Sequence, residues 1–187
     1  PEYGNYRYVP DFSEFIAHVE TEYEKTKQPV KCALDLETIG LDEFALPGIN
    51  PDTKLPDASH PGAYIVTIQL SHTEGMADVV KFDSRQHEEK MLSDFDFAYQ
   101  IAWLLSTPKI KMRGANLKFD LRWLFARGGF ECTNFRLDTT LVGSILDENR
   151  SNGLDVHAKI YVPRLAGYSD VFDRTANKSR MDLELLK

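Results

Sequence analysis

Three consecutive β segments, followed by helices and strands in alternation, leave few architectures open to this chain. Apolar runs rich in β-branched residues predict strands, and apolar residues repeating every three or four positions predict helices. The predicted strands span 30–36, 63–70, 76–82, 109–113 and 134–137, and the predicted helices 11–27, 88–106, 116–127, 138–147 and 153–161. A meander followed by β-α-β-α crossovers implies an α/β fold, whose mixed sheet has an antiparallel meander, then parallel crossovers, and is flanked by helices.

Two carboxylates stand at the end of the first predicted strand. Asp35 and Glu37 are two residues apart, so strand periodicity directs both side chains to one face. Like charges held together repel one another and lose hydration, which a bound cation relieves. Mg²⁺ or Mn²⁺ suits such oxygen ligands. The alternative is that Asp35 faces solvent at the strand end and Glu37 is a surface loop residue.

A third carboxylate, Asp120, lies on the predicted helix 116–127. Asn116 is four residues earlier and shares a helix face with it, although Asn116 also suits the N-cap position of that helix. A solvated surface position is the competing interpretation of Asp120. Asp138, like Asn116, suits an N-cap position, here that of the next predicted helix, 138–147.

These residues carry a family resemblance. Asp35-x-Glu37 followed by Thr38-Ile39-Gly40-Leu41 resembles the first motif of the DEDD-type 3′–5′ exonucleases, and residues 114–121 (GANLKFDL) resemble the second, Asn-x-x-x-(Phe/Tyr)-Asp. Residues 137–154 most resemble the proofreading domains of bacterial and phage family A DNA polymerases. An isolated Asp-x-Glu is unspecific, but both motifs in order form a specific pattern. The resemblance covers roughly residues 30 to 173.

The resemblance implies a ribonuclease H-like fold and hydrolysis with two Mg²⁺ or Mn²⁺ ions. Asp35 is then expected to bridge both ions, Glu37 to bind the ion that carries the attacking water, and Asp120 to bind the second ion. These three are the implied catalytic and metal-binding residues. The residues implied to contact the 3′-terminal nucleotide of the substrate are Thr38, Leu41 and Asn116.

The family's third motif, Tyr-x-x-x-Asp or His-x-x-x-x-Asp, has no match in this sequence. Tyr168 and Asp173 have the wrong spacing, His157 is followed five residues later by Val162, and residues 181–187 stand where the motif is expected to begin. We therefore expect residues 1–187 to be a single 3′–5′ exonuclease domain, truncated at both ends and lacking the third motif. Hydrolysis by this chain alone is expected to be weak or absent.

Three functions follow from the resemblance. The first is the proofreading 3′–5′ exonuclease domain of a family A DNA polymerase, acting on the 3′ end of single-stranded DNA with the polymerase domain of the parent chain as partner; the run Asp147-Glu148-Asn149-Arg150 favours it. The second is a stand-alone 3′–5′ exoribonuclease of the same superfamily. The third is an inactive exonuclease-fold scaffold, against which the three retained carboxylates count.

Composition narrows the cellular setting. The net charge of −7 argues against binding nucleic acid by charge alone, although acidic groups that hold cations can still meet phosphate. No apolar run approaches the roughly 20 residues of a membrane helix, so no membrane partner is expected. Cys32 and Cys132 are expected to be reduced thiols in a cytoplasmic protein of a bacterial or phage-infected cell. The basic residues between 109 and 127 are interpreted as a DNA path or as a solvated face.

Overall fold

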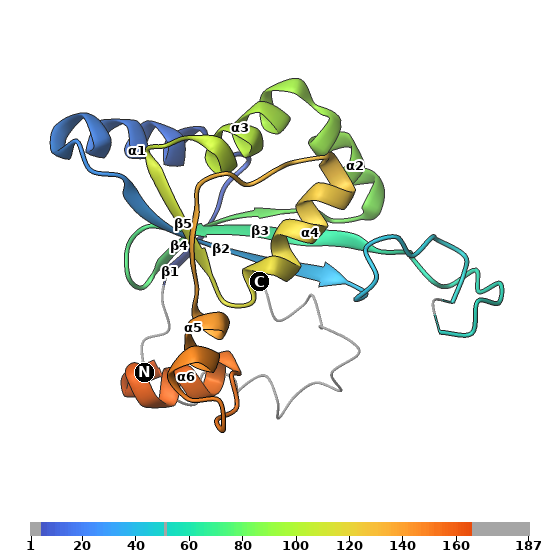
Figure 1. Cartoon of the computed structure of the whole chain (residues 1–187). Coiled ribbons are helices and arrows are strands. Elements are labelled where there is room, and N and C mark those ends of the chain that lie inside the picture. Colours follow the sequence, from blue (N-terminus) through green and yellow to red (C-terminus); the bar gives the residue numbers. More distant parts are fainter. Residues whose placement is uncertain (1–4, 51, 166–187) are drawn as a thin grey trace. The chain divides into compact units, whose positions relative to one another are not determined.

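A six-stranded sheet organises residues 4–138 (Figure 1). The computed structural model describes residues 5–50 and 52–165, and the chain divides into two units between Asp138 and Thr139. The strands are β1 (Asn5–Tyr8), β2 (Val30–Ile39), β3 (Tyr64–Ser71), β4 (Met76–Lys81), β5 (Ile110–Gly114) and β6 (Phe135–Asp138). Their order across the sheet is β1-β4-β3-β2-β5-β6.

Strand directions confirm the predicted mixed sheet. β2, β3 and β4 form an antiparallel meander, and β5 and β6 are then added parallel to β2. β1 pairs parallel with β4 at the outer edge and was not predicted. Its four residues are all exposed, and the alternation of Tyr6 and Tyr8 with polar residues is too short to have indicated a strand.

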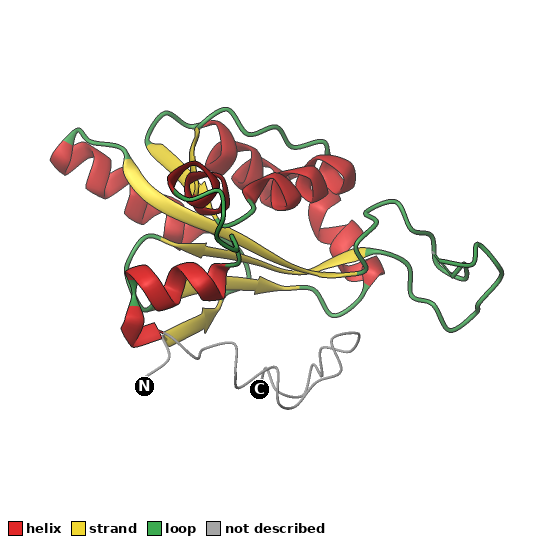
Figure 2. Ribbon diagram, turned by 60° about the horizontal axis from the view of Figure 1, so that its bottom comes forward, coloured by secondary structure: helices red, strands yellow, loops and turns green. Residues whose placement is uncertain are grey.

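Four helices of this unit pack on one face of the sheet (Figure 2). They are α1 (Ser13–Thr26), α2 (Arg85–Ser93), α3 (Phe95–Ser106) and α4 (Leu117–Gly128). Their buried side chains join those of β2, β3 and β5 in one apolar core, which includes Phe15, Leu34, Ile68, Leu104, Met112 and Trp123. Burial of this shared face holds the helices on the sheet.

The predicted single helix over 88–106 is wrong, because Asp94 divides it into α2 and α3. Asp94 has an extended backbone, with ψ of 128°, and its side chain accepts a hydrogen bond from the N–H of Phe97 at 3.1 Å. The apolar stripe continues across the break, from Leu92 to Phe97 and Ile101, so periodicity alone could not reveal it. The other predicted helices and strands are present with shifted ends.

The second unit contains α5 (Thr139–Leu146), α6 (Leu154–Tyr161) and a 3-10 turn at Pro163–Leu165. Gly143 lets α5 approach His157 of α6, because a Cβ there would lie 2.2 Å from the imidazole Nε2. None of the helices that the structure describes is long and apolar enough to cross a membrane. Both cysteines are free thiols.

Candidate functional site

Strand β2 positions the first two candidate carboxylates. Its alternate residues Cys32, Leu34 and Leu36 are buried in the core, so Asp35 and Glu37 lie on the opposite face. Asp35 is exposed and Glu37 is half-buried. β2 continues through both residues to Ile39, which makes Glu37 a strand residue rather than a loop residue. The register of β2 against β3 shifts directly after Glu37.

Asp120 of α4 lies against β2 between these two residues. β5 ends at Gly114, and its pairing with β2 stops at Ala33, so the edge of β2 is open beyond that point. The carboxylate of Asp120 uses this opening and accepts a hydrogen bond from the backbone N–H of Leu36 at 3.1 Å. Asp120 is only 3% exposed, so the alternative of a solvated surface residue is wrong.

The electrostatics of the three carboxylates show that they lie near one another. Burial, the negative charge of Asp35 and, more weakly, that of Glu37 raise the pKa of Asp120 to about 8, against the lowering effect of the Leu36 N–H. Burial and the charge of Asp35 raise the pKa of Glu37 to about 7. Partial loss of hydration next to the surrounding protein raises the pKa of Asp35 as well, although its side chain is exposed. Together these effects favour a cation beside the three groups.

The chemistry of these donors fits a hard divalent cation. Three carboxylates with raised pKa values offer the oxygen ligands that Mg²⁺ and Mn²⁺ prefer, and a cation would relieve their mutual repulsion. Across the described residues, however, no group of three or more His, Cys, Asp or Glu side chains is arranged so that it could hold a metal ion. The fit therefore rests on donor chemistry and on the shared electrostatics.

Asn116 stands at the N-terminus of α4 with its side chain exposed. Its backbone is left-handed, with φ of 57°, and its side chain makes no capping hydrogen bond. The N-cap interpretation of this side chain is therefore not supported. Asn is among the few non-glycine residues that adopt this conformation readily. The amide of Asn116 is left available for a ligand, one helical turn before Asp120.

Thr38 and Leu41 follow the carboxylates at the start of the long loop 40–63. The hydroxyl of Thr38 donates a hydrogen bond to the carbonyl of Gly40 at 3.0 Å, and the side chain of Leu41 is 81% exposed. Thr38 thus shapes the turn that leaves β2, whereas Leu41 presents an apolar surface to solvent. The loop then projects beyond the ends of β2 and β3 (Figure 1).

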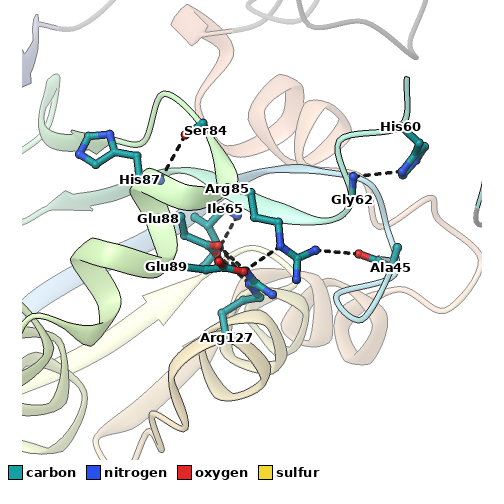
Figure 3. Close-up of polar contacts among 10 residues, drawn as sticks. All are labelled: Ala45, His60, Gly62, Ile65, Ser84, Arg85, His87, Glu88, Glu89 and Arg127. Carbon is teal, nitrogen blue, oxygen red and sulfur yellow. Dashed lines mark hydrogen bonds and ion pairs between the residues drawn. The ribbon is translucent and has the colours of Figure 1, made fainter. Parts of the chain in front are cut away.

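Ion pairs and hydrogen bonds tie the base of this loop to α2 and α4. Glu43 is buried and pairs with Arg122 of α4 at 2.9 Å. Arg85 of α2 donates to the carbonyl of Ala45 at 3.1 Å (Figure 3). Gly62 is left-handed, and a Cβ there would lie 2.6 Å from Arg85 Nη1, so the loop closes tightly against this guanidinium.

A buried ion pair joins α2 and α4 in the same region. Glu88 is fully buried, accepts from the N–H of Ile65 on β3 at 3.0 Å, and pairs with Arg127 of α4 at 2.6 Å (Figure 3). Arg127 also reaches Glu89, which pairs with Arg85. The sequence analysis did not single out Glu88, because its polar neighbours conceal that it is buried.

Three of the basic residues near the second motif pair with acidic side chains. Arg122 pairs with Glu43, Arg127 with Glu88, and Lys109 with Glu20. Pairing with acidic side chains neutralises these three as phosphate ligands. The residues considered for the third motif, 168–173 and 181–187, lie outside the described residues.

Asp138 has a role that the sequence analysis did not predict. Its carboxylate accepts hydrogen bonds from the N–H groups of Asn116 at 3.0 Å and of Leu117 at 2.8 Å, and so caps α4. The predicted capping of the following helix by Asp138 stays a prediction. A carboxylate that caps a helix 21 residues earlier in the chain leaves no local signal in the sequence.

No family model and no curated protein matches this chain. Solved structures do match it. Escherichia coli RNase D, described as an exoribonuclease involved in structured RNA processing, gives a TM-score of 0.57 at 13% identity over 95% of this chain and 38% of its own. The catalytic core of RRP6 from Trypanosoma brucei gives 0.55 at 15% identity over 96% and 40%.

Brucella melitensis NrnC also matches, in two structures. NrnC bound to pGG gives a TM-score of 0.51 at 18% identity over 84% of this chain and 59% of NrnC. NrnC with bound Mg²⁺ gives 0.50 at 16% identity over 94% and 65%. This chain thus spans less than two thirds of the length of each of these proteins. The mixed sheet flanked by helices is the ribonuclease H-like fold that these structures share with this chain, as the sequence predicted.

Proposed function

We propose that this chain is a metal-dependent 3′–5′ exonuclease that removes nucleotides from the 3′ end of RNA. The observation that carries the proposal is the approach of Asp120 to β2 between Asp35 and Glu37, through its hydrogen bond to Leu36. Asp120, more than 80 residues later in the sequence, is thereby brought to the end of the strand that carries Asp35 and Glu37. Their raised pKa values support a role in binding cations.

The residues present define what each would do. When bound, a pair of Mg²⁺ or Mn²⁺ ions would activate the attacking water and stabilise the leaving 3′ oxygen. Asp35, the most open carboxylate, is suited to hold both ions, with Glu37 and Asp120 holding one each. The N–H of Leu36 holds one carboxylate oxygen of Asp120 in place. The other oxygen would then be the one that binds an ion. The exposed amide of Asn116 would orient the terminal nucleotide, together with Thr38 and Leu41.

The proposed substrate follows from the structures that share the fold. RNase D is described as an exoribonuclease, and NrnC is bound to pGG in one structure and to Mg²⁺ in another. These descriptions favour a stand-alone exoribonuclease over proofreading of single-stranded DNA. The polymerase hypothesis, with a polymerase domain as partner, depends on the resemblance at residues 137–154. The sequence of the parent gene beyond Lys187 separates the two, because polymerase motifs there would support proofreading.

A hydrolysis assay tests the proposed function. A 5′-labelled oligoribonucleotide and its deoxyribose counterpart are incubated with excess protein and Mn²⁺, and products are resolved at single-nucleotide length. We expect slow shortening of the RNA from its 3′ end, one nucleotide at a time, and none in EDTA. Internal cleavage, cleavage without metal, or faster hydrolysis of DNA would contradict the proposal as stated.

A further inference from the structure

The turn between β5 and α4 determines where Asn116 is placed. Residues 114–117 leave the sheet at Gly114 and enter α4 at Leu117, and within them Asn116 adopts the left-handed conformation. Asn adopts that conformation more readily than most residues do, but it is still less favourable than the right-handed one, so contacts around the turn help to hold it. The orientation of the exposed Asn116 side chain therefore depends on what fixes this turn.

Two features fix the turn. The buried carboxylate of Asp138, 4% exposed at the end of β6, accepts the N–H groups of both Asn116 and Leu117, one on each oxygen. Gly114 is packed so closely that a Cβ would lie 3.0 Å from the carbonyl oxygen of Leu34 and 2.8 Å from Leu117 Cδ1. The first holds the turn from β6, and the second seats it against β2.

Asp138 also links the turn to the sheet. It pairs in register with Gly114, the last residue of β5, so the strand that carries the carboxylate and the strand that leads into the turn are adjacent. A negative charge at this point is further stabilised by the N-terminus of α4. Asp120 lies one turn later on the same helix and has a separate anchor on β2, the N–H of Leu36.

We propose that Asp138 is a positioning residue for the 3′-terminal nucleotide: by binding both N–H groups of the turn, it holds Asn116 left-handed, with its amide directed to the substrate. This inference rests on the proposed function, in which Asn116 contacts that nucleotide. Asp138 itself touches neither metal nor substrate in this account. Its loss should weaken substrate binding more than the chemical step.

Single-turnover hydrolysis of the oligoribonucleotide with Mn²⁺, at varied protein concentration, separates binding from chemistry. We expect Asp138→Ala to raise the half-saturating concentration about tenfold, as the loss of one oriented hydrogen bond predicts, with little change in maximal rate. Asp94→Ala removes an equivalent cap from another helix, α3, and is the matched control. It should change neither the half-saturating concentration nor the maximal rate. Asp138→Asn keeps one acceptor oxygen and should show a smaller increase, which tests the inference if the alanine variant folds poorly.

A double-mutant cycle distinguishes positioning from general stabilisation. In an Asn116→Ala background, Asp138→Ala should add no further loss of binding, because the residue it positions is gone. Additive losses, or equal behaviour of the Asp138 and Asp94 variants, would overturn the inference.

If the wild-type chain hydrolyses nothing, the proposed function fails, and amide hydrogen exchange then tests the role of Asp138 separately. Faster exchange of the Asn116 and Leu117 amide protons in Asp138→Ala, but not in Asp94→Ala, would support the inference that Asp138 holds the turn. Unchanged exchange in Asp138→Ala would overturn it.

Discussion

At the scale of single residues, the three candidate carboxylates are held where they destabilise the folded protein unless their charge is balanced. The pKa of Asp120 is raised to about 8 and that of Glu37 to about 7, whereas both groups titrate near 4 in an unfolded chain. Between about pH 4 and pH 8 the folded protein retains protons that the unfolded chain has released. Its free energy of unfolding therefore falls as pH rises through this window.

A neutral variant of Asp120 tests this charge effect. Asp120→Asn keeps an oxygen for the Leu36 N–H and removes the charge, so in metal-free buffer we expect a gain of about 2 kcal/mol in the free energy of unfolding at pH 8. At pH 4 the gain should vanish, because Asp120 is then protonated in the folded protein. Urea unfolding at both pH values measures it. Asp52→Asn, at an exposed loop position, is the control, and equal gains at the two pH values would contradict the account.

Asp35 is the residue whose loss should affect hydrolysis most. Asp35→Asn removes the most open of the three carboxylates and part of the repulsion that raises the pKa values of Glu37 and Asp120. Metal-ion catalysis supplies several kcal/mol, so we expect the single-turnover rate with Mn²⁺ to fall at least about a thousandfold. The same Asp52→Asn variant serves as control. A fall below tenfold would remove Asp35 from the catalytic role.

Some features of the site could be predicted from the sequence and others could not. The motif pattern selects Asp35, Glu37 and Asp120 as candidates, because chemistry and spacing are local properties of a sequence, and their role as a site stays a prediction. The capping of α4 by Asp138 and the left-handed backbone of Asn116 were not predictable, since both depend on β6 meeting the start of α4. Contacts between residues distant in sequence leave no periodic signal.

At the scale of elements, the pair Glu88–Arg127 joins α2, α4 and β3. Glu88 is fully buried and the Arg127 side chain is 11% exposed, so removal of one partner leaves a charge without compensation. We expect Glu88→Ala to lower the free energy of unfolding by about 3–5 kcal/mol. A double variant, Glu88→Leu with Arg127→Met, should recover much of that loss because neither charge remains.

Urea unfolding measures both effects, and an exposed pair provides the comparison. Glu22 and Lys25 are 3.6 Å apart on the surface of α1, and Glu22→Ala should cost no more than about 0.5 kcal/mol. Equal losses at the buried and exposed positions would show that burial of Glu88 does not govern its contribution.

Elements were predicted well where periodicity and stop signals agree. The C-terminus of α4 is an example, since the predicted helix ends at 127 and Gly129 adopts the left-handed conformation of a C-cap. The break at Asp94 and the edge strand β1 were missed because the first interrupts no apolar stripe and the second buries no side chain.

At the scale of the whole molecule, all six candidate site residues lie in the unit 4–138. The sheet and the four helices that form its core belong to the same unit. We expect a protein comprising residues 1–138 to fold cooperatively and to bind Mn²⁺ with the affinity of the full chain. Circular dichroism, urea unfolding and calorimetry measure this. A fragment that stays unfolded would show that residues beyond Asp138 are needed to form the unit.

The order of elements predicted the α/β class and the mixed sheet, because strand connections and helix crossovers restrict topology strongly. The division of the chain near Asp138 was not predicted, and the expectation of a single domain remains a prediction. No composition shift or linker marks that boundary in the sequence.

The central claim is that Asp35, Glu37 and Asp120 form one cation site, and calorimetric titration of Mn²⁺ into the metal-free chain tests it most directly. We predict saturable binding by the wild type, loss of that binding in Asp35→Ala, and unchanged binding in the Asp52→Asn control. Wild-type protein that takes up no Mn²⁺, or Asp35→Ala protein that binds it as the wild type does, would contradict the claim.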